Sequence, residues 1–449
     1  MEEFDLIVIG GGPGGVKAAM EASQAGMKTA LIEADTLGGT CLNHGCIPTK
    51  TLLHTAELYK EVRSGDEIGL IAPDALVDMK KLQAYKNNVV AKLGGGIAQK
   101  LQKAGVTVIM GRAKLLSPTE VAVSDETLRT KRVLLAAGSL PARISVPGSN
   151  LPGVYDSTAM LNLETVPESL VIIGGGVIGM EFASLYADLG TKVTVLEALD
   201  RLLANMDREF GQSLKMSLKK QGVETHSSAS LKEIRKSGEK LVCIYEENGA
   251  EASVECEAVL VAAGRKPNTD GLFSPGCEPE TERGFVAVNE RYESSIPGVW
   301  AIGDVIGGIQ LAHMASAEAI NAVAAMCGKE APIHTKVVPS CVYTSPEIAT
   351  VGISAQDAKK QGLSVEAKKY AMTANGKTVL SRGERGFITI VADAETGTIL
   401  GAQMLCERAT DMIGEFAAAV ANQLTVGELS AVIRPHPTFN EAVWELLRE

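Results

Sequence analysis

Two cysteines near the start of the chain stand five residues apart in a glycine-rich stretch. Cys41 and Cys46 belong to residues 38–50, a segment that also contains Gly45 and Pro48. Residues five apart in a regular helix differ by about 7.5 Å of rise and about 140° of rotation. Their Cα atoms would lie about 8.7 Å apart, which is beyond the reach of a disulfide. We therefore interpret the pair as a redox-active disulfide in distorted backbone, which Gly45 and Pro48 would permit. The alternative is two unrelated buried thiols.

A strand, a glycine turn, a helix and a second strand occur twice in the same order. The first copy predicts a strand over residues 5–9, a turn over 10–15, a helix over 16–26 and a strand over 28–33. The second copy predicts a strand over residues 170–173, a turn over 174–179, a helix to about residue 190 and a strand over 192–197. The agreement between the copies indicates two sites of the same kind.

Each copy ends on an acid at the same distance from its first glycine. Glu33 lies 23 residues after Gly10, and Glu197 lies 23 residues after Gly174. One G-x-G-x-x-G turn is weak evidence, but a strand before it, a helix after it and an acid about 20 residues on indicate dinucleotide binding. The glycines let the backbone approach a pyrophosphate at the positive end of a helix. We expect both acids to accept from a ribose hydroxyl, and Glu197 to favour NAD over NADP by repelling a 2′-phosphate. The alternative for either acid is a solvated residue at a strand end.

Composition excludes several classes of partner. The chain has 449 residues, a length that suggests about three domains. Its net charge is -11 and its pI is near 5.3, so no basic stripe is available for nucleic acid. Its 8 cysteines are too sparse for a disulfide-stapled secreted scaffold. We see no leader pattern and no apolar span of about 18 residues, so we expect a cytoplasmic enzyme that does not associate with a membrane.

Several further segments organise the chain. Residues 133–139 and 259–265 are both apolar strands that end in a small-residue turn, and the chain crosses between domains at 141–152 and 266–269. The stretch 298–304 predicts a strand that delivers Asp304 at a tight turn. That carboxylate is either an acceptor for a cofactor polyol or an ordinary turn residue. A long amphipathic helix over residues 77–104 would serve packing only.

The last part of the chain has a different pattern. Strands are predicted over residues 387–391 and 398–404, and helices over 409–422 and 427–433. Strands followed by helices indicate an α+β module rather than a third nucleotide fold. We therefore divide the chain into residues 1–145, 146–265, 266–331 and 332–449.

The order of the motifs resembles the pyridine nucleotide-disulfide oxidoreductase family over essentially the whole chain. That order is a G-x-G-x-x-G turn, a C-x-x-x-x-C pair, a second such turn, Asp304 after a glycine, and a late His436-Pro437-Thr438 followed by Glu441. Residues 39–43, 46–50 and 311–313, together with Glu197, are most similar to members that oxidise dihydrolipoamide. His44 and the Phe439-Asn440 pair depart from the family pattern and leave the disulfide substrate open.

The resemblance implies an α/β fold with two Rossmann-like dinucleotide-binding domains and a C-terminal α+β dimerisation domain. Residues 1–145 and 266–331 would bind FAD, residues 146–265 would bind NAD, and residues 332–449 would form the interface of a homodimer. The cofactor-binding residues that we predict are Gly10, Gly12, Gly15, Glu33, Gly39, Thr40, Lys50, Ala113, Ala137, Gly138, Ser139, Gly174, Gly176, Gly179, Glu181, Glu197, Gly264, Gly303, Asp304, Leu311, Ala312 and His313.

The resemblance also implies the catalytic roles. Cys46 would lie next to the flavin, and Cys41 would exchange with the substrate. Exchange requires a thiolate, and His436, oriented by Glu441, is the candidate base. By resemblance this pair comes from the second subunit of the homodimer. The alternative for His436 is an ordinary core or surface histidine.

Lys50 follows the cysteine pair within about one turn of helix. By resemblance it would lie beside the flavin ring, paired with Glu181, and stabilise negative charge on the reduced ring. The alternative is a surface lysine. His54, His226 and His334 have no partner that suggests a metal site, and we expect no metal.

The reaction implied by the resemblance is the oxidation of dihydrolipoamide to lipoamide with reduction of NAD⁺ to NADH. The substrate would be free dihydrolipoamide or a lipoyl-bearing protein. One alternative is a related disulfide reductase of the glutathione or coenzyme A type, although Glu197 argues against an NADPH-dependent one. Another is a scaffold subunit whose main role is docking into a multienzyme complex.

Overall fold

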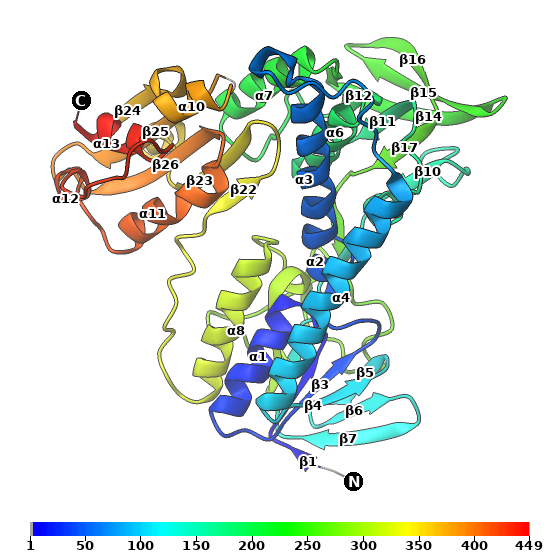
Figure 1. Cartoon of the computed structure of the whole chain (residues 1–449). Helices are drawn as coiled ribbons and strands as arrows, with labels where there is room; N and C mark the ends of the chain where they lie inside the picture. Colours follow the sequence, from blue (N-terminus) through cyan, green and yellow to red (C-terminus); the bar gives the residue numbers. More distant parts are fainter. Residues whose placement is uncertain (1–2, 384, 449) are drawn as a thin grey trace.

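The computed structural model describes residues 3–383 and 385–448, which form three units. In the view of Figure 1 the first unit, with the N-terminus, lies at the bottom, the middle unit at the upper right and the C-terminal unit at the upper left. Within the described residues, no helix is both long enough and apolar enough to span a membrane.

The first unit is built on a parallel sheet in the order β21-β8-β2-β3-β4. Its central strands are almost wholly apolar because both faces of the sheet are covered. Leu6 and Val8 pack against helices α1 and α8, whereas Ile7 and Ile9 pack against a second, four-stranded sheet. The bounds are β21 (Val299–Ala301), β8 (Val133–Leu135), β2 (Leu6–Ile9), β3 (Thr29–Glu33), β4 (Thr107–Met110), α1 (Pro13–Gln24) and α8 (Ala312–Met326), with β1 (Glu3–Phe4), β7 (Glu126–Thr130), β6 (Glu120–Val123) and β5 (Ala113–Ser117) in the second sheet.

The middle unit repeats this plan in the order β10-β17-β11-β12-β13. Leu170 and Ile172 face helices α6 and α7, whereas Val171 and Ile173 face an antiparallel sheet of β14, β15 and β16. The internal repeat predicted from the sequence is therefore confirmed. The bounds are β10 (Val154–Asp156), β17 (Ala258–Val261), β11 (Ser169–Ile173), β12 (Lys192–Glu197), β13 (Glu224–Ser227), α5 (Ser157–Met160), α6 (Val177–Asp188), α7 (Arg208–Lys220), β14 (Ala229–Ser237), β15 (Lys240–Glu247) and β16 (Ala250–Cys256).

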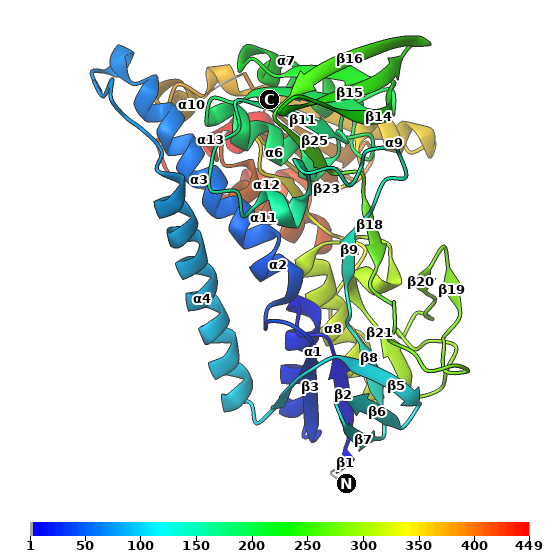
Figure 2. The ribbon, with the colours of Figure 1, turned by 90° about the vertical axis from the view of Figure 1, so that its right-hand side faces the viewer.

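Two long helices and a pair of short strands connect these units. The helices α3 and α4 lie side by side and run from the first unit toward the middle unit (Figure 2). Leu52 and Ala56 of α3 belong to the core of the middle unit, so α3 is fixed against α6. The connecting elements are α2 (Gly39–Asn43), α3 (Cys46–Arg63), η1 (Asp66–Ile68), α4 (Met79–Lys103), the antiparallel pair β9 (Ser139–Pro141) and β18 (Arg265–Pro267), β19 (Thr281–Glu282), β20 (Phe285–Val286) and η2 (Gly303–Ile306).

The C-terminal unit is an antiparallel sheet in the order β22-β23-β26-β25-β24. Helices α11 and α13 pack on it through apolar residues such as Phe416 and Val443. The bounds are β22 (Ser340–Val342), β23 (Glu347–Gly352), β24 (Val365–Ala371), β25 (Phe387–Asp393), β26 (Ile399–Cys406), α9 (Ala355–Lys360), η3 (Met372–Ala374), α10 (Gly376–Leu380), α11 (Ala409–Ala421), α12 (Val426–Ser430) and α13 (Glu441–Arg448). The unit is α+β, as predicted.

Some expected bounds were wrong by a few residues. The first helix begins at Pro13, inside the glycine turn, because proline suits the first helical position. The helix expected over residues 427–433 ends at Ser430, and residues 431–433 are exposed. The crossings expected at residues 141–152 and 266–269 overlap with β9 and β18, which pair with each other.

Candidate active site

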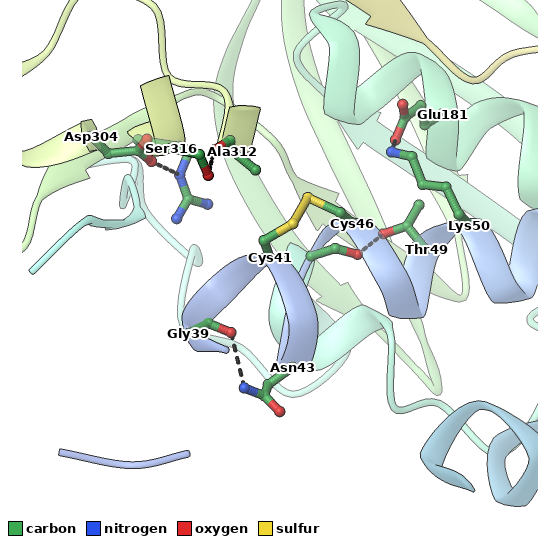
Figure 3. Close-up of a disulfide and its surroundings, with 12 residues drawn as sticks. Gly39, Cys41, Asn43, Cys46, Thr49, Lys50, Glu181, Asp304, Ala312 and Ser316 are labelled. Carbon is green, nitrogen blue, oxygen red and sulfur yellow. Dashed lines mark hydrogen bonds and ion pairs between the residues drawn. A yellow bond between two sulfur atoms is a disulfide. The ribbon is translucent and has the colours of Figure 1, made fainter. Parts of the chain in front are cut away.

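The structure joins Cys41 and Cys46 in a disulfide at the junction of α2 and α3 (Figure 3). Their Cα atoms lie 4.7 Å apart because the helix is interrupted at His44 and Gly45, and α3 starts at Cys46. The distorted backbone expected from the spacing is therefore present. Both cysteines are half-buried, so the disulfide is within reach of a substrate.

Pro48 does not make the break that the sequence suggested. It lies in the first turn of α3, after the interruption, where a missing N–H leaves no helical hydrogen bond unmade. The interruption itself follows from Gly45, whose φ and ψ of -151° and -108° end one helix before the next begins. A Cβ on Gly45 would stand 3.1 Å from the Thr40 carbonyl oxygen.

The first glycine turn fits a dinucleotide pyrophosphate. Gly10 has a φ of +108°, and a Cβ there would overlap the Ala136 carbonyl oxygen. A Cβ on Gly15 would overlap the Gly10 carbonyl oxygen, so both outer glycines are required by the packing of the turn on the sheet. A Cβ on Gly12, by contrast, would meet only the Cα of Gly39, at 4.0 Å. The middle glycine thus leaves open space at the N-terminus of α1, where a phosphate is favoured.

The second turn shows the same pattern. Gly174 has a φ of +112°, and a Cβ on Gly179 would overlap its carbonyl oxygen. Nothing lies within 4 Å of a Cβ placed on Gly176. In both turns the outer glycines are packed against backbone, and the middle glycine leaves free space at the start of a helix. The residues of both turns therefore fit a bound dinucleotide.

Glu33 and Glu197 hold the two turns in place. The Glu33 carboxylate accepts from the Gly11 N–H at 2.6 Å and from the Asp35 N–H at 2.8 Å. The Glu197 carboxylate accepts from the Gly175 N–H at 2.5 Å and from the Leu199 N–H at 2.7 Å. Both acids are buried, which excludes the alternative of a solvated strand end. Each oxygen retains a second lone pair for a ribose hydroxyl, and that contact stays a prediction.

Lys50 joins three parts of the structure. Its Nζ lies 2.7 Å from Glu181 Oε2 of α6, and 4.5 Å from the centre of the Tyr343 ring. The other oxygen of Glu181 accepts from the Tyr343 N–H at 3.1 Å. The expected pairing of Lys50 with Glu181 is present, and Figure 3 shows it beside the disulfide.

Asp304 lies on the other side of the disulfide in Figure 3, near Ala312. Its carboxylate accepts from the Ser139 hydroxyl, and the Arg265 Nε lies 3.7 Å away. Arg265 Nε also donates to the Ser139 hydroxyl at 2.7 Å, and burial lowers the pKa of its guanidinium. These contacts fix the carboxylate that we predict to bind the cofactor polyol.

Glu318 stabilises the turn that carries Asp304. Its carboxylate accepts from the Gly303 N–H at 2.7 Å. Burial, and to a smaller extent the nearby charge of Asp304, raises the pKa of Glu318 to about 7. A buried acid therefore bonds to the backbone of the residue that precedes Asp304.

His436 and Glu441 form a hydrogen-bonded pair. His436 Nδ1 lies 2.7 Å from one oxygen of Glu441, whose other oxygen accepts from the Thr438 N–H at 2.9 Å. The Thr438 N–H and His436 hold the pKa of Glu441 below its usual value. The His436 side chain is 81% exposed. Figure 1 shows α12 and α13, which flank it, on the outer side of the C-terminal unit, away from α2.

A buried ion pair anchors the loop that carries His436. Arg434, whose side chain is only 3% exposed, pairs with Glu415 of α11 and donates to the Val432 carbonyl oxygen at 3.0 Å. The other oxygen of Glu415 accepts from Asn440 at 3.4 Å. Glu415 therefore holds the loop on both sides of the imidazole.

The remaining predicted residues lie around the two turns and the disulfide. His313 Nε2 lies 2.8 Å from the Pro339 carbonyl oxygen. The others occupy element ends on the first and middle units: Gly39 and Thr40 in α2, Ala113 at the start of β5, Ala137 and Gly138 between β8 and β9, Gly264 before β18, Gly303 in η2, and Leu311 and Ala312 at the start of α8.

Sequence reasoning missed four residues that support the site. They are Tyr343, Arg265, Glu415 and Arg434, each of which acts through a residue distant in the chain. No spacing rule connects such positions. The only available signal was the position of Arg434, two residues before His436.

Comparison with known proteins places this geometry in a family. Residues 4–319 match the model described as pyridine nucleotide-disulphide oxidoreductase, and residues 338–447 match that of its dimerisation domain. Dihydrolipoyl dehydrogenases of Bacillus subtilis and Thermus scotoductus are 38% and 39% identical to the chain. Each of the two alignments covers 99% of this chain and 97% of the relative.

Solved structures agree with the sequence comparison. The HOCl-induced flavoprotein disulfide reductase RclA from Escherichia coli matches with a TM-score of 0.90 and 29% identity over 100% of this chain and 99% of that one. LpdA from Mycobacterium tuberculosis matches with a TM-score of 0.90 and 26% identity over 99% of both chains. The chain belongs to the pyridine nucleotide-disulfide oxidoreductase family.

Proposed function

We propose that this chain is a dihydrolipoyl dehydrogenase that uses FAD and NAD⁺. The observation that carries the proposal is the packing of the disulfide segment on the first glycine turn. The Gly38 N–H donates to the Gly11 carbonyl oxygen at 2.7 Å, and α2, which carries Cys41, begins at the next residue. A dinucleotide held by that turn is therefore close to the disulfide. Bound FAD would pass the electron pair of a dithiol on to NAD⁺.

The disulfide accepts the electrons of the substrate by thiol exchange. His436 takes a proton from one substrate thiol, and the thiolate attacks the Cys41 sulfur. The bond between Cys41 and Cys46 breaks, and a mixed disulfide forms. The second substrate thiol loses its proton to solvent, and its thiolate attacks the substrate sulfur of that mixed disulfide, which closes lipoamide and releases Cys41 as a thiolate. The electron pair then resides on the two cysteine sulfurs.

Two ionised groups support this exchange. Lys50 supplies a fixed positive charge near Cys46, and Glu181 keeps its ammonium in place. Glu441 accepts from the imidazole of His436 and so orients the ring for proton transfer. Both assignments rest on these contacts and on the resemblance of the motifs.

A homodimer would complete the site. The chain carries the dimerisation domain of the family, and its C-terminal unit exposes large apolar side chains, with Ile433 at 84% and Val379 at 65%. Burial of such a surface favours association. An exposed imidazole, flanked in the chain by helices that lie away from α2 in Figure 1, suits a base supplied to a second subunit.

Four further proposals complete the assignment. We propose the domain division at residues 1–145, 146–265, 266–331 and 332–449, which is supported by strand β21 of the third range pairing with β8 of the first. NAD preference rests on Glu197. A lipoyl-bearing protein is the proposed natural substrate, and the cytoplasm is the proposed location.

A stopped-flow experiment tests the function. The flavin absorbance is followed after mixing the enzyme with dihydrolipoamide, glutathione or coenzyme A, and separately with NADH. Rapid flavin reduction by dihydrolipoamide, followed by NADH formation when NAD⁺ is added, is the expected result. Rapid exchange with glutathione or coenzyme A alone would indicate a related disulfide reductase. A preparation without flavin that binds an acyltransferase core would indicate a scaffold subunit.

A further inference from the structure

Tyr343 lies against the ion pair of Lys50 and Glu181. It follows β22 in the C-terminal unit, whereas Lys50 belongs to α3 and Glu181 to α6. The Tyr343 N–H donates to Glu181 Oε1 at 3.1 Å, and the centre of the Tyr343 ring lies 4.5 Å from Lys50 Nζ. One residue of the C-terminal unit therefore contacts both members of the ion pair.

The distance between Lys50 and the ring is that of a cation–π interaction. An ammonium within about 6 Å of the centre of an aromatic ring is attracted to the face of the ring. The Glu181 carboxylate, which is buried, accepts only one of the three ammonium N–H groups of Lys50. A lysine ammonium is otherwise strongly hydrated and sits on a flexible stem. The ring replaces water on one side of the ammonium and so limits the positions that it can take.

The ring of Tyr343 is the part of the side chain that acts on Lys50. Burial raises the pKa of the Tyr343 hydroxyl to about 12, so the hydroxyl is neutral near pH 7 and adds no charge beside the ammonium. The face of the ring attracts a cation whether or not the ring carries a hydroxyl. Phenylalanine should therefore replace Tyr343, and an aliphatic residue should not.

We propose that Tyr343 is a positioning residue whose ring holds the Lys50 ammonium toward the flavin, so that reduction of the flavin depends on docking of the C-terminal unit. The inference rests on the proposed function, in which Lys50 stabilises negative charge on the reduced flavin. Without the ring, the ammonium keeps Glu181 as a partner but can turn toward water, which weakens its interaction with that negative charge. Tyr343 thus acts on the flavin through Lys50.

A second cluster of the same composition supplies a matched control. Lys369 of β24 pairs with Glu209 of α7, and its Nζ lies 4.0 Å from the centre of the Phe387 ring in β25. This cluster also joins the middle unit to the C-terminal unit. In Figure 1, α7, β24 and β25 lie near the top of the molecule, whereas α2 lies near its middle. Phe387→Leu therefore removes a ring from a lysine–glutamate pair that is not beside the disulfide.

The test measures how far NADH reduces the flavin at equilibrium. All variants are made in a Cys46→Ser background, which lacks the disulfide, so that hydride transfer from NADH yields NAD⁺ and reduced flavin only. Flavin spectra are recorded without oxygen, at a ratio of NADH to NAD⁺ that half reduces the parent protein. Tyr343→Leu should lower the ratio of reduced to oxidised flavin about threefold to tenfold. Tyr343→Phe and Phe387→Leu should leave it within about twofold of the parent value.

A double-mutant cycle with Lys50→Met shows whether the ring acts through Lys50. In a Lys50→Met parent, Tyr343→Leu should change the flavin ratio less than about twofold. An equal decrease with and without Lys50, an equal decrease in Tyr343→Phe, or no decrease in Tyr343→Leu would overturn the inference. Tyr343→Met is a second variant without a ring, for use if Tyr343→Leu does not retain flavin. Because this equilibrium involves no dihydrolipoamide, it is independent of the proposed function, which a wild-type flavin that dihydrolipoamide fails to reduce would overturn instead.

Discussion

Lys50 and Glu181 are separated by 131 residues in the chain and form an ion pair of 2.7 Å between α3 and α6. The same two helices are joined again at Lys60 and Asp188, at 3.2 Å. The first pair lies about one turn from Cys46, and the second lies almost three turns further along α3. The structure therefore contains two similar ion pairs of which only one is beside the disulfide.

Lys50→Met should lower dihydrolipoamide turnover at least about tenfold, because it removes the charge that supports electron transfer. Lys60→Met is the matched control and should lower it less than about threefold. Each change removes one ion pair between α3 and α6, and the two should cost similar stability, on the order of 1–3 kcal/mol. Steady-state kinetics and urea unfolding measure the two effects. Equal losses of turnover would show that Lys50 acts only by joining the helices.

The two cysteines should be distinguishable by colour. Cys41→Ser and Cys46→Ser should both abolish dithiol turnover but keep FAD and some NADH oxidation by artificial acceptors, because hydride reaches the flavin without the disulfide. If Cys46 lies next to the flavin, the Cys41→Ser variant should keep a long-wavelength charge-transfer band from the Cys46 thiolate to the flavin. The Cys46→Ser variant should lose this band. Absorption spectra at several pH values check this. The reverse pattern would exchange the two roles.

The sequence was sufficient to predict the repeated units and the disulfide, because both depend on local rules. The spacing of apolar residues and glycines predicted β2, α1, β3 and their second copies. A disulfide between cysteines five residues apart required an interruption of the helix between Cys41 and Cys46. The sheets that cover the back faces were not predicted. Val121 and Cys243 become buried only because another sheet packs on them, and no local pattern contains that partner.

The same distinction applies to the site. Glu33 and Glu197 could be found because they stand at a fixed distance from a glycine turn. Tyr343 and Glu415 could not, because each contacts its partner through packing of the C-terminal unit. The sequence also gave no indication that both ribose acids would accept from the backbone of their own turns.

Glu415 should act as a positioning residue for His436. Glu415→Gln keeps the size of the side chain but removes the charge that pairs with buried Arg434, at a cost of about 2–4 kcal/mol in stability. We expect dihydrolipoamide turnover to fall about threefold to thirtyfold while NADH oxidation by artificial acceptors is kept, because only thiol exchange needs the imidazole. The pH profile of turnover should also shift.

The control for Glu415 is Tyr370→Phe. The Tyr370 hydroxyl bonds Glu445 and so anchors α13 to β24. It should lower the free energy of unfolding but leave the ratio of the two activities unchanged. A Glu415→Gln enzyme with an unchanged ratio and pH profile would reduce Glu415 to a purely structural residue.

Glu318 should make stability depend on pH near neutrality. Its folded pKa of about 7 lies above that of an unfolded glutamate. Its contribution is therefore complete below about pH 4.5 and is lost as the pH rises through 7, by up to about 3 kcal/mol. The free energy of unfolding of the Glu318→Gln variant should fall less than that of the wild type over this pH range. Urea unfolding of the holoenzyme at pH 5.5 and about 8.5 measures the difference, with exposed Glu330→Gln as the control. An identical pH dependence in wild type and Glu318→Gln would contradict the prediction.

The imidazole of His436 should act on the disulfide of the other subunit, because it is exposed and because α12 and α13, which flank it in the chain, lie on the side of the C-terminal unit away from α2 (Figure 1). A heterodimer of a Cys41→Ser chain and a His436→Gln chain tests this. If the base acts in trans, one of its two sites combines an intact disulfide with an intact base, and the other has neither. If the base acts in cis, both sites are damaged. Mass spectrometry confirms that the re-formed mixtures contain the heterodimer. These mixtures should show dihydrolipoamide turnover well above that of either parent homodimer. If the two sites are independent, the turnover of the heterodimer should approach about half of the wild-type value. Parent chains that are separately dissociated and re-formed control for damage during the exchange, and turnover no higher than theirs would rule out the shared site.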